Sequence, residues 1–475
     1  MSSPKHSHRD GVLIIGLDSA DWSILRELSD RNLLPNLKRI IRHSFNADLV
    51  STVPDMTPPA WTSFITGVNP ARHNVYGFFQ PSGNGIKLTG GRTRKAPSIW
   101  EMMDEDCVKL LMNVPLTYPA SPVNGCMISD SLTFDKSGEW TWPSKEKQNM
   151  LRLGYNKCLI PDITQTKKLD QLTESVEARS RAFLDLARRY NSCFSMIVFS
   201  ETDWVQHLFP GQISAIAEVY KKIDEFIMAI SLSQKRQTLL LIASDHGYNL
   251  ASRKFLINNW LIRIGLLKVR PSRSSLNSLH FPLQAKVTEF APHLFKLIPR
   301  QVSLKIATSI RSPSKSLSTM SGLYSIGWDL GEYLRLHLTE NEKERYEYYF
   351  TELSEKAKKL IDTKTGQNPI KRVIRKGEVY CGPYLRSAPD FLIQLDRRFS
   401  GNERIFPASG MFLDYKAGIH RRNGVIISKW LNTKEENDKT VSKIDVCDIA
   451  PTILHVFGRR MRRTDGKVIS EIINI

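Results

Sequence analysis

Short, almost uninterrupted hydrophobic runs recur along the chain, and amphipathic stretches separate them. Residues 12–17 (VLIIGL) form the first run, and residues 193–200 and 237–244 form two more. A run of this length, rich in branched residues, is typical of a strand that is buried on both faces of a sheet. We therefore expect three central strands at these positions.

The stretches beside these runs have the spacing of helices. Apolar residues recur every three or four positions in Ser29–Ile41, in Leu169–Tyr190 and in Ile213–Ile230, which predicts helices with one buried face. Strands that alternate with helices of this length favour a mostly parallel sheet covered on both faces. The pattern thus predicts an α/β fold.

Polar residues with metal-ligand chemistry follow each predicted strand. Asp18 follows the first strand, Asp203 and His207 follow the second, and Asp245 and His246 follow the third. In sheets of this kind, ligands bind beyond the carboxyl ends of the strands. We expect these side chains to emerge at one edge of the sheet. A single aspartate there would be an ordinary cap or turn residue, but three groups in register indicate a site.

The spacing within these groups suits metal binding. Four positions separate Asp203 from His207, which places both on one side of a helical turn. Asp245 and His246 are adjacent and need an irregular loop, which Gly247 permits. Carboxylate oxygens and imidazole nitrogens are ligands of zinc and similar cations. Two such cations about 4 Å apart can activate a nucleophile and neutralise a leaving oxygen in phosphate-ester cleavage.

Length and charge suggest one large domain with a basic insertion. The chain has 475 residues and a net charge of +19, and residues 251–320 hold twelve Lys or Arg but one acid. We assign 11–250 and 321–475 to a hydrolase core, 251–320 to an inserted cap and 1–10 to a tail. The insertion has two interpretations. It is a solvated segment packed on the core, or a basic lid that attracts a polyanionic substrate or contacts an anionic membrane.

Composition also bears on partners and compartment. The positive charge suits a phosphate substrate, nucleic acid or an anionic membrane equally well, although no nucleic-acid-binding module is recognisable. Six cysteines occur without a short spacing, and we interpret them as reduced thiols. The apolar run at 12–17 is too short for a signal peptide, and none reaches the ~20 residues that span a bilayer. We expect a cytoplasmic protein of unknown oligomeric state.

Several motifs together resemble one enzyme family. VPDMTPPAWTSFITGVNPARHNVYGF (53–78) resembles the nucleophile segment of type I phosphodiesterases and nucleotide pyrophosphatases, in the alkaline phosphatase superfamily. The ordered series GLDSAD, MTPPAWTSFITG, DWVQH, SDHG and GIH is similar to that family's metal-site series. NVPLTYP (113–119), GPY…APD (382–390) and DIAPTILHVFG (448–458) extend the likeness over nearly the whole chain, most weakly in 130–165 and 251–320.

The resemblance implies a fold, a cofactor and a mechanism. The fold would be an alkaline-phosphatase-like three-layer sandwich with a mostly parallel central sheet and an inserted cap. The cofactor would be two divalent cations, zinc or alternatively manganese. Thr57 would attack the phosphorus of a small anionic phosphate ester and form a phosphothreonine. The first cation would be held by Asp18, Thr57, Asp245 and His246, and the second by Asp203, His207 and His420.

The sequence also departs from the family pattern. The better-known nucleotide pyrophosphatases carry Asn-His shortly after the nucleophile, where this chain has Ala60 and Trp61, so one donor to the phosphate is missing. Sulfatases require Cys or Ser as nucleophile, and the related phosphoglycerate mutases use serine. A phosphomonoesterase, a phosphonate hydrolase and an inactive anion-binding relative stay as alternatives. We interpret His73 as a structural hydrogen-bonding residue.

Overall fold

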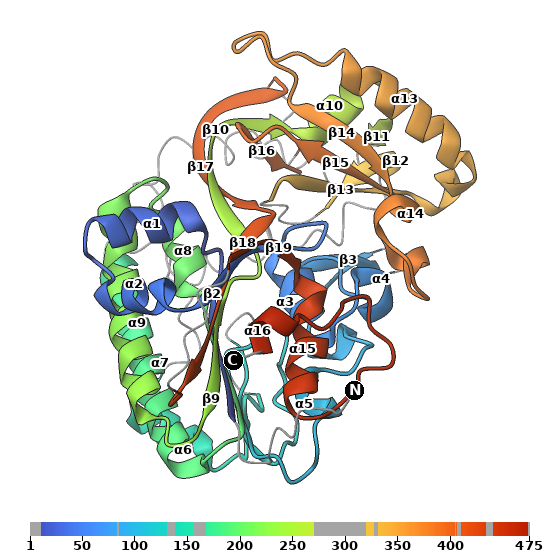
Figure 1. The fold of residues 1–475 in the computed structure, drawn as a ribbon. Coiled ribbons are helices and arrows are strands. Elements are labelled where there is room, and N and C mark those ends of the chain that lie inside the picture. Colours follow the sequence, from blue (N-terminus) through green and yellow to red (C-terminus); the bar gives the residue numbers. More distant parts are fainter. Residues whose placement is uncertain are drawn as a thin grey trace.

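The computed structural model consists of a larger unit with a broad sheet between two layers of helices and a smaller unit above it (Figure 1). None of the helices within the described ranges is long and apolar enough to cross a bilayer. The ranges that the structure describes are 11–82, 85–130, 138–155, 168–269, 320–326, 331–403, 405, 410–433 and 440–473.

The sheet of the larger unit has nine strands in the order β19-β2-β18-β9-β1-β8-β5-β6-β7. The strands pair in parallel except at β18 and β7. The three predicted runs form the neighbouring strands β8, β1 and β9, which confirms the central strands and the α/β fold. The strands are β1 (Gly11–Leu17), β2 (Phe45–Val50), β5 (Lys109–Met112), β6 (Gly125–Ile128), β7 (Thr141–Trp142), β8 (Phe194–Phe199), β9 (Thr238–Ala243), β18 (Asn423–Leu431) and β19 (Thr440–Asp445).

Alternate residues of β1 pack on opposite layers of helices. Leu13 and Ile15 belong to one buried cluster, with helices α1, α2 and α6–α9, whereas Val12 and Ile14 belong to the other, with α3, α5, α15 and α16. The first layer is α1 (Trp22–Asp30), α2 (Pro35–Arg42), α6 (Glu146–Arg152), α7 (Lys168–Tyr190), α8 (Glu201–Leu208) and α9 (Ile213–Ser233), and the second is α3 (Thr57–Thr66), α5 (Ile99–Met102), α15 (Ile449–Val456) and α16 (Ser470–Ile473).

Two long helices agree with the sequence, and one predicted helix is wrong. α7 and α9 occupy the stretches predicted for them. The predicted helix at Ser29–Ile41 is instead the end of α1 and most of α2. Asn32 between them has a left-handed φ of 56°, and Pro35, which lacks an N–H, can only begin a helix. The periodic apolar positions therefore belong to two short helices.

The smaller unit is built on a five-stranded sheet with its own buried cluster. A three-stranded sheet, β16-β10-β17, joins it to the larger unit. The elements of this part are β10 (Gly247–Leu256), α10 (Ile257–Arg263), β11 (Leu267–Val269), β12 (Met320–Ser325), β13 (Tyr333–Leu338), α13 (Tyr346–Lys358), β14 (Ile370–Arg375), α14 (Lys376–Val379), β15 (Phe391–Leu395), β16 (Phe399–Asn402) and β17 (Phe412–Arg421). After α3 the chain forms α4 (Pro70–His73) and the paired strands β3 (Phe79–Ser82) and β4 (Gly85–Leu88).

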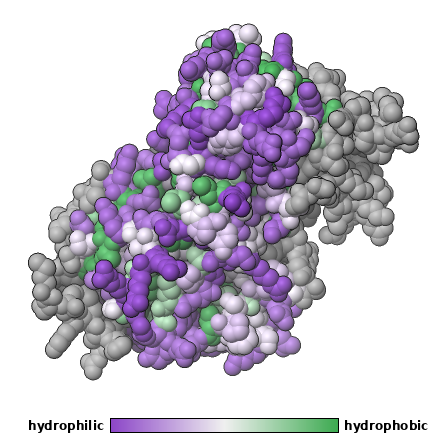
Figure 2. Space-filling view, turned by 90° about the vertical axis from the view of Figure 1, so that its right-hand side faces the viewer, coloured by the Kyte–Doolittle hydropathy of each residue, from purple (hydrophilic) through white to green (hydrophobic). Residues whose placement is uncertain are grey.

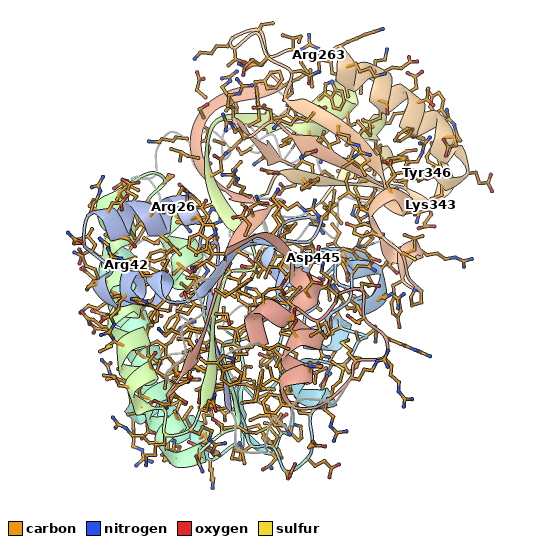
Figure 3. The ribbon with its side chains drawn as sticks, viewed as in Figure 1. Arg26, Arg42, Arg263, Lys343, Tyr346 and Asp445 are labelled. Carbon is orange, nitrogen blue, oxygen red and sulfur yellow. A yellow bond between two sulfur atoms is a disulfide. The ribbon has the colours of Figure 1, made fainter. Side chains whose placement is uncertain are left out.

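These sheets bear on the predicted domain boundaries. The strands between residues 320 and 395 pair with one another and with β11 in the five-stranded sheet rather than with the central sheet. Most of the predicted cap, from 270 to 319, and the tail 1–10 lie outside the described residues. The division at residues 250 and 321 therefore stays a prediction. Basic side chains are not confined to the insertion, since Arg26 and Arg42 lie at the periphery of the larger unit (Figure 3). One face of the molecule is mostly hydrophilic with scattered apolar areas (Figure 2).

The prediction that every cysteine is a reduced thiol is wrong. Cys107 and Cys193, which are 86 positions apart, form a disulfide. Both precede strands that are neighbours in the central sheet, β5 and β8, so the fold brings together two residues whose separation in sequence carries no signal. Cys126, Cys381 and Cys447 are free thiols. The cysteines therefore support a cytoplasmic location less strongly than the sequence suggested.

Candidate metal centre

The predicted polar groups emerge at one edge of the central sheet. Asp18 follows β1, the loop 244–246 follows β9, and α8 begins two residues before Asp203. His420 comes from β17, where it pairs with Tyr248 of β10. Thr57 is the first residue of α3. The seven side chains named from the sequence therefore come from five separate stretches of the chain to one place.

The first group of side chains surrounds Nε2 of His246. That nitrogen lies 3.5 Å from Oδ1 of Asp18, 3.3 Å from Oδ2 of Asp245 and 3.3 Å from Oγ1 of Thr57. All four residues are buried. The predicted nucleophile is thus in direct contact with the group predicted to hold the first cation.

The second group surrounds Oδ1 of Asp203. This oxygen lies 3.1 Å from Nε2 of His207 and 3.4 Å from Nε2 of His420, and the two nitrogens are 3.0 Å apart. Ligand atoms of Asp18, Asp203 and His246 also lie within 4.8 Å of one another, and the rings of His246 and His420 stack at 3.8 Å. Asp203 therefore stands between the two groups, which form one centre.

The backbone orients the three imidazoles. Nδ1 of His420 lies 3.0 Å from the carbonyl of Asp55, and Nδ1 of His246 lies 3.3 Å from the carbonyl of Gly247. His207 has a hydrogen bond with the backbone of Gly418. A histidine that donates Nδ1–H to a carbonyl keeps a lone pair on Nε2, which is the usual arrangement of a metal ligand. Each of the three Nε2 atoms lies on the side of the carboxylates, where a neutral ring can offer its lone pair to a cation. Burial lowers the pKa of His207, but the Asp203 carboxylate outweighs burial and raises that pKa, so this ring can donate to Asp203 when no cation is bound.

The carboxylates also lack the partners that burial requires. Oδ1 of Asp18, Oδ1 of Asp203 and Oδ2 of Asp245 are buried and accept no hydrogen bond. Buried polar atoms without partners are rare in folded proteins, so each needs an explanation. Three carboxylates and three imidazole nitrogens form a mixed oxygen and nitrogen donor set, which fits divalent zinc or manganese.

The acid–base equilibria reflect this crowding. Burial, and then the neighbouring carboxylates, raise the pKa of Asp18 and of Asp245 well above the usual range. Burial also raises the pKa of Asp203, but His207 and His420 outweigh it and hold that pKa well below its usual range. Burial and the nearby His420 lower the pKa of His246, which keeps its imidazole neutral and able to bind a cation.

A polar framework fixes the loop that carries Asp18. Thr202 donates from Oγ1 to the carbonyl of Asp18 at 2.6 Å, and Gln206 donates from Nε2 to the carbonyl of Ser19 at 3.0 Å. Ser19 has a left-handed φ of 63°, which turns the chain sharply after the ligand. Asp21, the second aspartate of the GLDSAD motif, caps α1 by accepting from the N–H groups of Ser23 and Ile24.

The residues that depart from the family pattern are part of this framework. Trp61 is fully buried and donates from its indole nitrogen to Oδ2 of Asp18 at 3.4 Å, so it contacts a predicted ligand. Its ring packs so closely on β1 that a Cβ at Gly16 would lie 2.5 Å away.

His73 is confirmed as structural, since its Nε2 lies 2.9 Å from Oγ of Ser63 and its Nδ1 accepts from the backbone of Val75.

The sequence did not indicate the carbonyl groups behind the histidines. Asp55 and Gly418 act through the main chain, and any residue type has a carbonyl, so no side-chain pattern could reveal them. The sequence analysis explained Gly247 by the irregular loop at 245–246, but the structure gives a different explanation. A Cβ there would lie 2.1 Å from the carbonyl of Asn423, so close packing of two strands explains this glycine better than loop freedom does.

Comparisons with known proteins place the chain in a family. Phosphonoacetate hydrolase from Sinorhizobium meliloti, in complex with phosphonoacetate, is 13% identical with a TM-score of 0.60, over 93% of this chain and 94% of that one. Murine ectonucleotide pyrophosphatase/phosphodiesterase 5 is 11% identical with a TM-score of 0.54, over 96% and 97%. These likenesses show a shared alkaline-phosphatase-like fold. A search of curated protein sequences finds no match. The family model described as type I phosphodiesterase/nucleotide pyrophosphatase matches residues 12–407, and the chain therefore belongs to this family.

Proposed function

We propose that this protein is a two-metal hydrolase of phosphate diesters or pyrophosphates, with Thr57 as its nucleophile. One observation carries the proposal. Three imidazole Nε2 atoms and three buried carboxylate oxygens without a hydrogen-bond donor lie together beside the hydroxyl of Thr57. Such a donor set around a hydroxyl suits hydrolysis of an ester whose phosphate repels nucleophiles.

The proposed roles divide the centre in two. Asp18, Asp245, His246 and Thr57 would hold one cation, and Asp203, His207 and His420 would hold the other. Bound there, divalent cations supply charge that lowers the pKa of a hydroxyl and neutralises phosphoryl and leaving-group oxygens. Zinc is the proposed metal, with manganese as the alternative.

Thr57 is well placed to act on phosphorus. It begins α3, so the positive end of the helix dipole would lie beside a phosphate bound at Thr57. Pro58 and Pro59 have fixed φ angles, which hold the start of the helix rigid. In the proposed reaction, Oγ1 bonds to phosphorus, the bond from phosphorus to one ester oxygen breaks, and that oxygen takes up the proton of the hydroxyl and leaves as an alcohol. Thr57 is then a phosphothreonine that still carries the second ester group. Water cleaves its bond to phosphorus, which releases a phosphomonoester and restores the hydroxyl.

A matched pair of variants tests this function. Thr57→Ala should abolish turnover of bis(p-nitrophenyl) phosphate and leave bound metal in place, measured by elemental analysis. Thr62→Ala is the control, because Thr62 lies on the same helix and its hydroxyl bonds only to the carbonyl of Pro58. Retained turnover in Thr57→Ala would remove Thr57 from the mechanism. An inactive threonine-to-alanine variant of the murine relative has been solved in complex with AMP, which supports the choice of residue.

Substrate preference is the second part of the test. Faster turnover of the diester than of p-nitrophenyl phosphate supports a phosphodiesterase, and the reverse supports a phosphomonoesterase. Phosphonoacetate belongs in the same panel, because a protein of the same fold is a phosphonoacetate hydrolase.

We also propose that the natural substrate is a small anionic ester. For the insertion at 251–320, contact with an anionic membrane is the alternative role. Metal binding without turnover of any compound would favour an inactive anion-binding relative.

A further inference from the structure

The loop between β2 and α3 carries a buried carboxylate that the proposed mechanism does not use. Asp55 is fully buried, two residues before Thr57. Its carbonyl faces Nδ1 of His420 at 3.0 Å, and its Oδ2 accepts a hydrogen bond from the backbone N–H of Glu332 at 3.1 Å. Glu332 directly precedes β13. One residue therefore touches the nucleophile loop, a predicted metal ligand and the smaller unit.

Other contacts join the same loop to the smaller unit. The hydroxyl of Tyr380, which follows α14, donates to the carbonyl of Val53 at 2.6 Å. Val53, Tyr333 and Tyr380 belong to one buried cluster that spans both units. The loop thus contacts the smaller unit at its start and at Asp55, and it leads into Thr57.

The fit at Asp55 is close enough to test. A Cβ at Gly331 would lie 2.2 Å from Oδ1 of Asp55 and 3.1 Å from its carbonyl oxygen. The backbone at Gly331 is not in the left-handed region, so the contact alone excludes a side chain here. Oδ1 is buried and accepts no hydrogen bond. A buried acceptor without a hydrogen bond costs stability. Such an atom is rare in a folded protein and therefore needs an explanation, and a functional role is one.

We propose that Asp55 is a positioning residue through which the smaller unit sets the orientation of His420. The inference rests on the proposed two-metal centre. Residues 331–332 pack against Asp55 and fix its position. The carbonyl of Asp55 is thereby held where it orients the imidazole of His420; we call this packing the Asp55 seat. If that seat is disturbed, His420 loses its orientation, and the cation held by Asp203, His207 and His420 is bound more weakly. The group of Asp18, Asp245 and His246 does not contact this seat and keeps its affinity.

Two glycines of the smaller unit make a matched test. Gly331→Ala should push residues 331–332 off Asp55, whereas a Cβ at Gly377, in α14, meets nothing within 4 Å. We expect Gly331→Ala to bind one cation at least about tenfold more weakly and the other normally, in line with the effects of residues behind metal ligands. Gly377→Ala should bind both like the wild type. Competition with a chelating dye measures both affinities for zinc.

Substitution of Asp55 separates positioning from folding. Asp55→Ala should weaken the same cation, and Asp55→Asn, which keeps an oxygen that can accept from the N–H of Glu332, should restore it. The inference is overturned if Gly331→Ala and Asp55→Ala both bind two cations with wild-type affinity, or if Asp55→Asn is no better than Asp55→Ala. A wild-type protein that binds fewer than two cations would overturn the two-metal function itself, and the inference with it.

Discussion

Arg253 joins two carboxylates of very different exposure, so the structure predicts which of its contacts is important for stability. Its Nε and Nη2 donate to the two carboxylate oxygens of Asp362 at 2.8 and 2.7 Å, and its Nη1 donates to Asp414. The side chain of Asp362 is 2% exposed, whereas that of Asp414 is 63% exposed. The proposed perturbation is Arg253→Met, which keeps an unbranched, flexible apolar side chain and removes the charge.

The two contacts should differ widely in energy. Removal of one partner of a buried ion pair costs about 3–5 kcal/mol, because the other charge stays buried without compensation. Arg253→Met should lie near the lower end of this range, since Oγ1 of Thr365 and the N–H of Lys364 still donate to Asp362. Asp414 is solvated, so Asp414→Asn should have little effect.

Urea unfolding followed by tryptophan fluorescence measures both variants. The pH adds a second check. Burial raises the pKa of Asp362, but hydrogen bonds from Arg253 outweigh it, so the pKa ends below its usual value. The stability from this pair is therefore complete above the ordinary aspartate pKa of about 3.9 and is lost as the pH falls below it. An effect of Asp414→Asn equal to that of Arg253→Met at pH 7 would refute the argument from burial.

Three further predictions concern other parts of the chain. Burial lowers the pKa of His73 to about 3, so unfolding should take up one proton between pH 6.5 and 3, and stability should fall with pH by up to about 1.4 kcal/mol per unit; His73→Gln should remove that slope in unfolding titrations. Replacement of Cys107 and Cys193 by serine should cost about 2–4 kcal/mol, and a reductant should lower the melting temperature of the wild type but not of this variant. Val269 and Met320 are paired on antiparallel strands, so a short Asn-Gly turn can replace 270–319, which hold eight Lys or Arg and one acid. KM for anionic substrates should then rise at low salt and converge with the wild-type value at high salt, and an unchanged KM would assign the insertion to packing.

The central sheet could be predicted because its strands carry their signal locally. β1 and β9 are buried at every residue, and β8 at every residue except Ser195; a strand buried on both faces is hydrophobic at nearly every position. The smaller unit gave no comparable signal. Its strands are mixed in character, such as MSGLYS in β12 and IKRVIR in β14, and even β13, which is buried at every residue, includes Arg335 and His337.

The candidate site could be assembled from motifs, but its supporting contacts could not. Asp18, Asp203 and Asp245 stand where the chain leaves a buried strand, which a sequence reveals. The carbonyl of Asp55 and the close approach at Gly331 depend on packing between units, which follows only from the folded chain. The disulfide between Cys107 and Cys193 was missed for the same reason.

The place of β18 in the central sheet bears on how the chain folds as it is made. β18 lies between β9 and β2 and is made late, at residues 423–431. Until β18 leaves the ribosome, β9 has no strand beside it on the side away from β1, although its residues are all buried in the complete fold. β2 likewise lacks its neighbour β18. Exposed apolar edges invite pairing with other chains. Nascent chains that stall before residue 423 should therefore depend on chaperones far more than complete chains do.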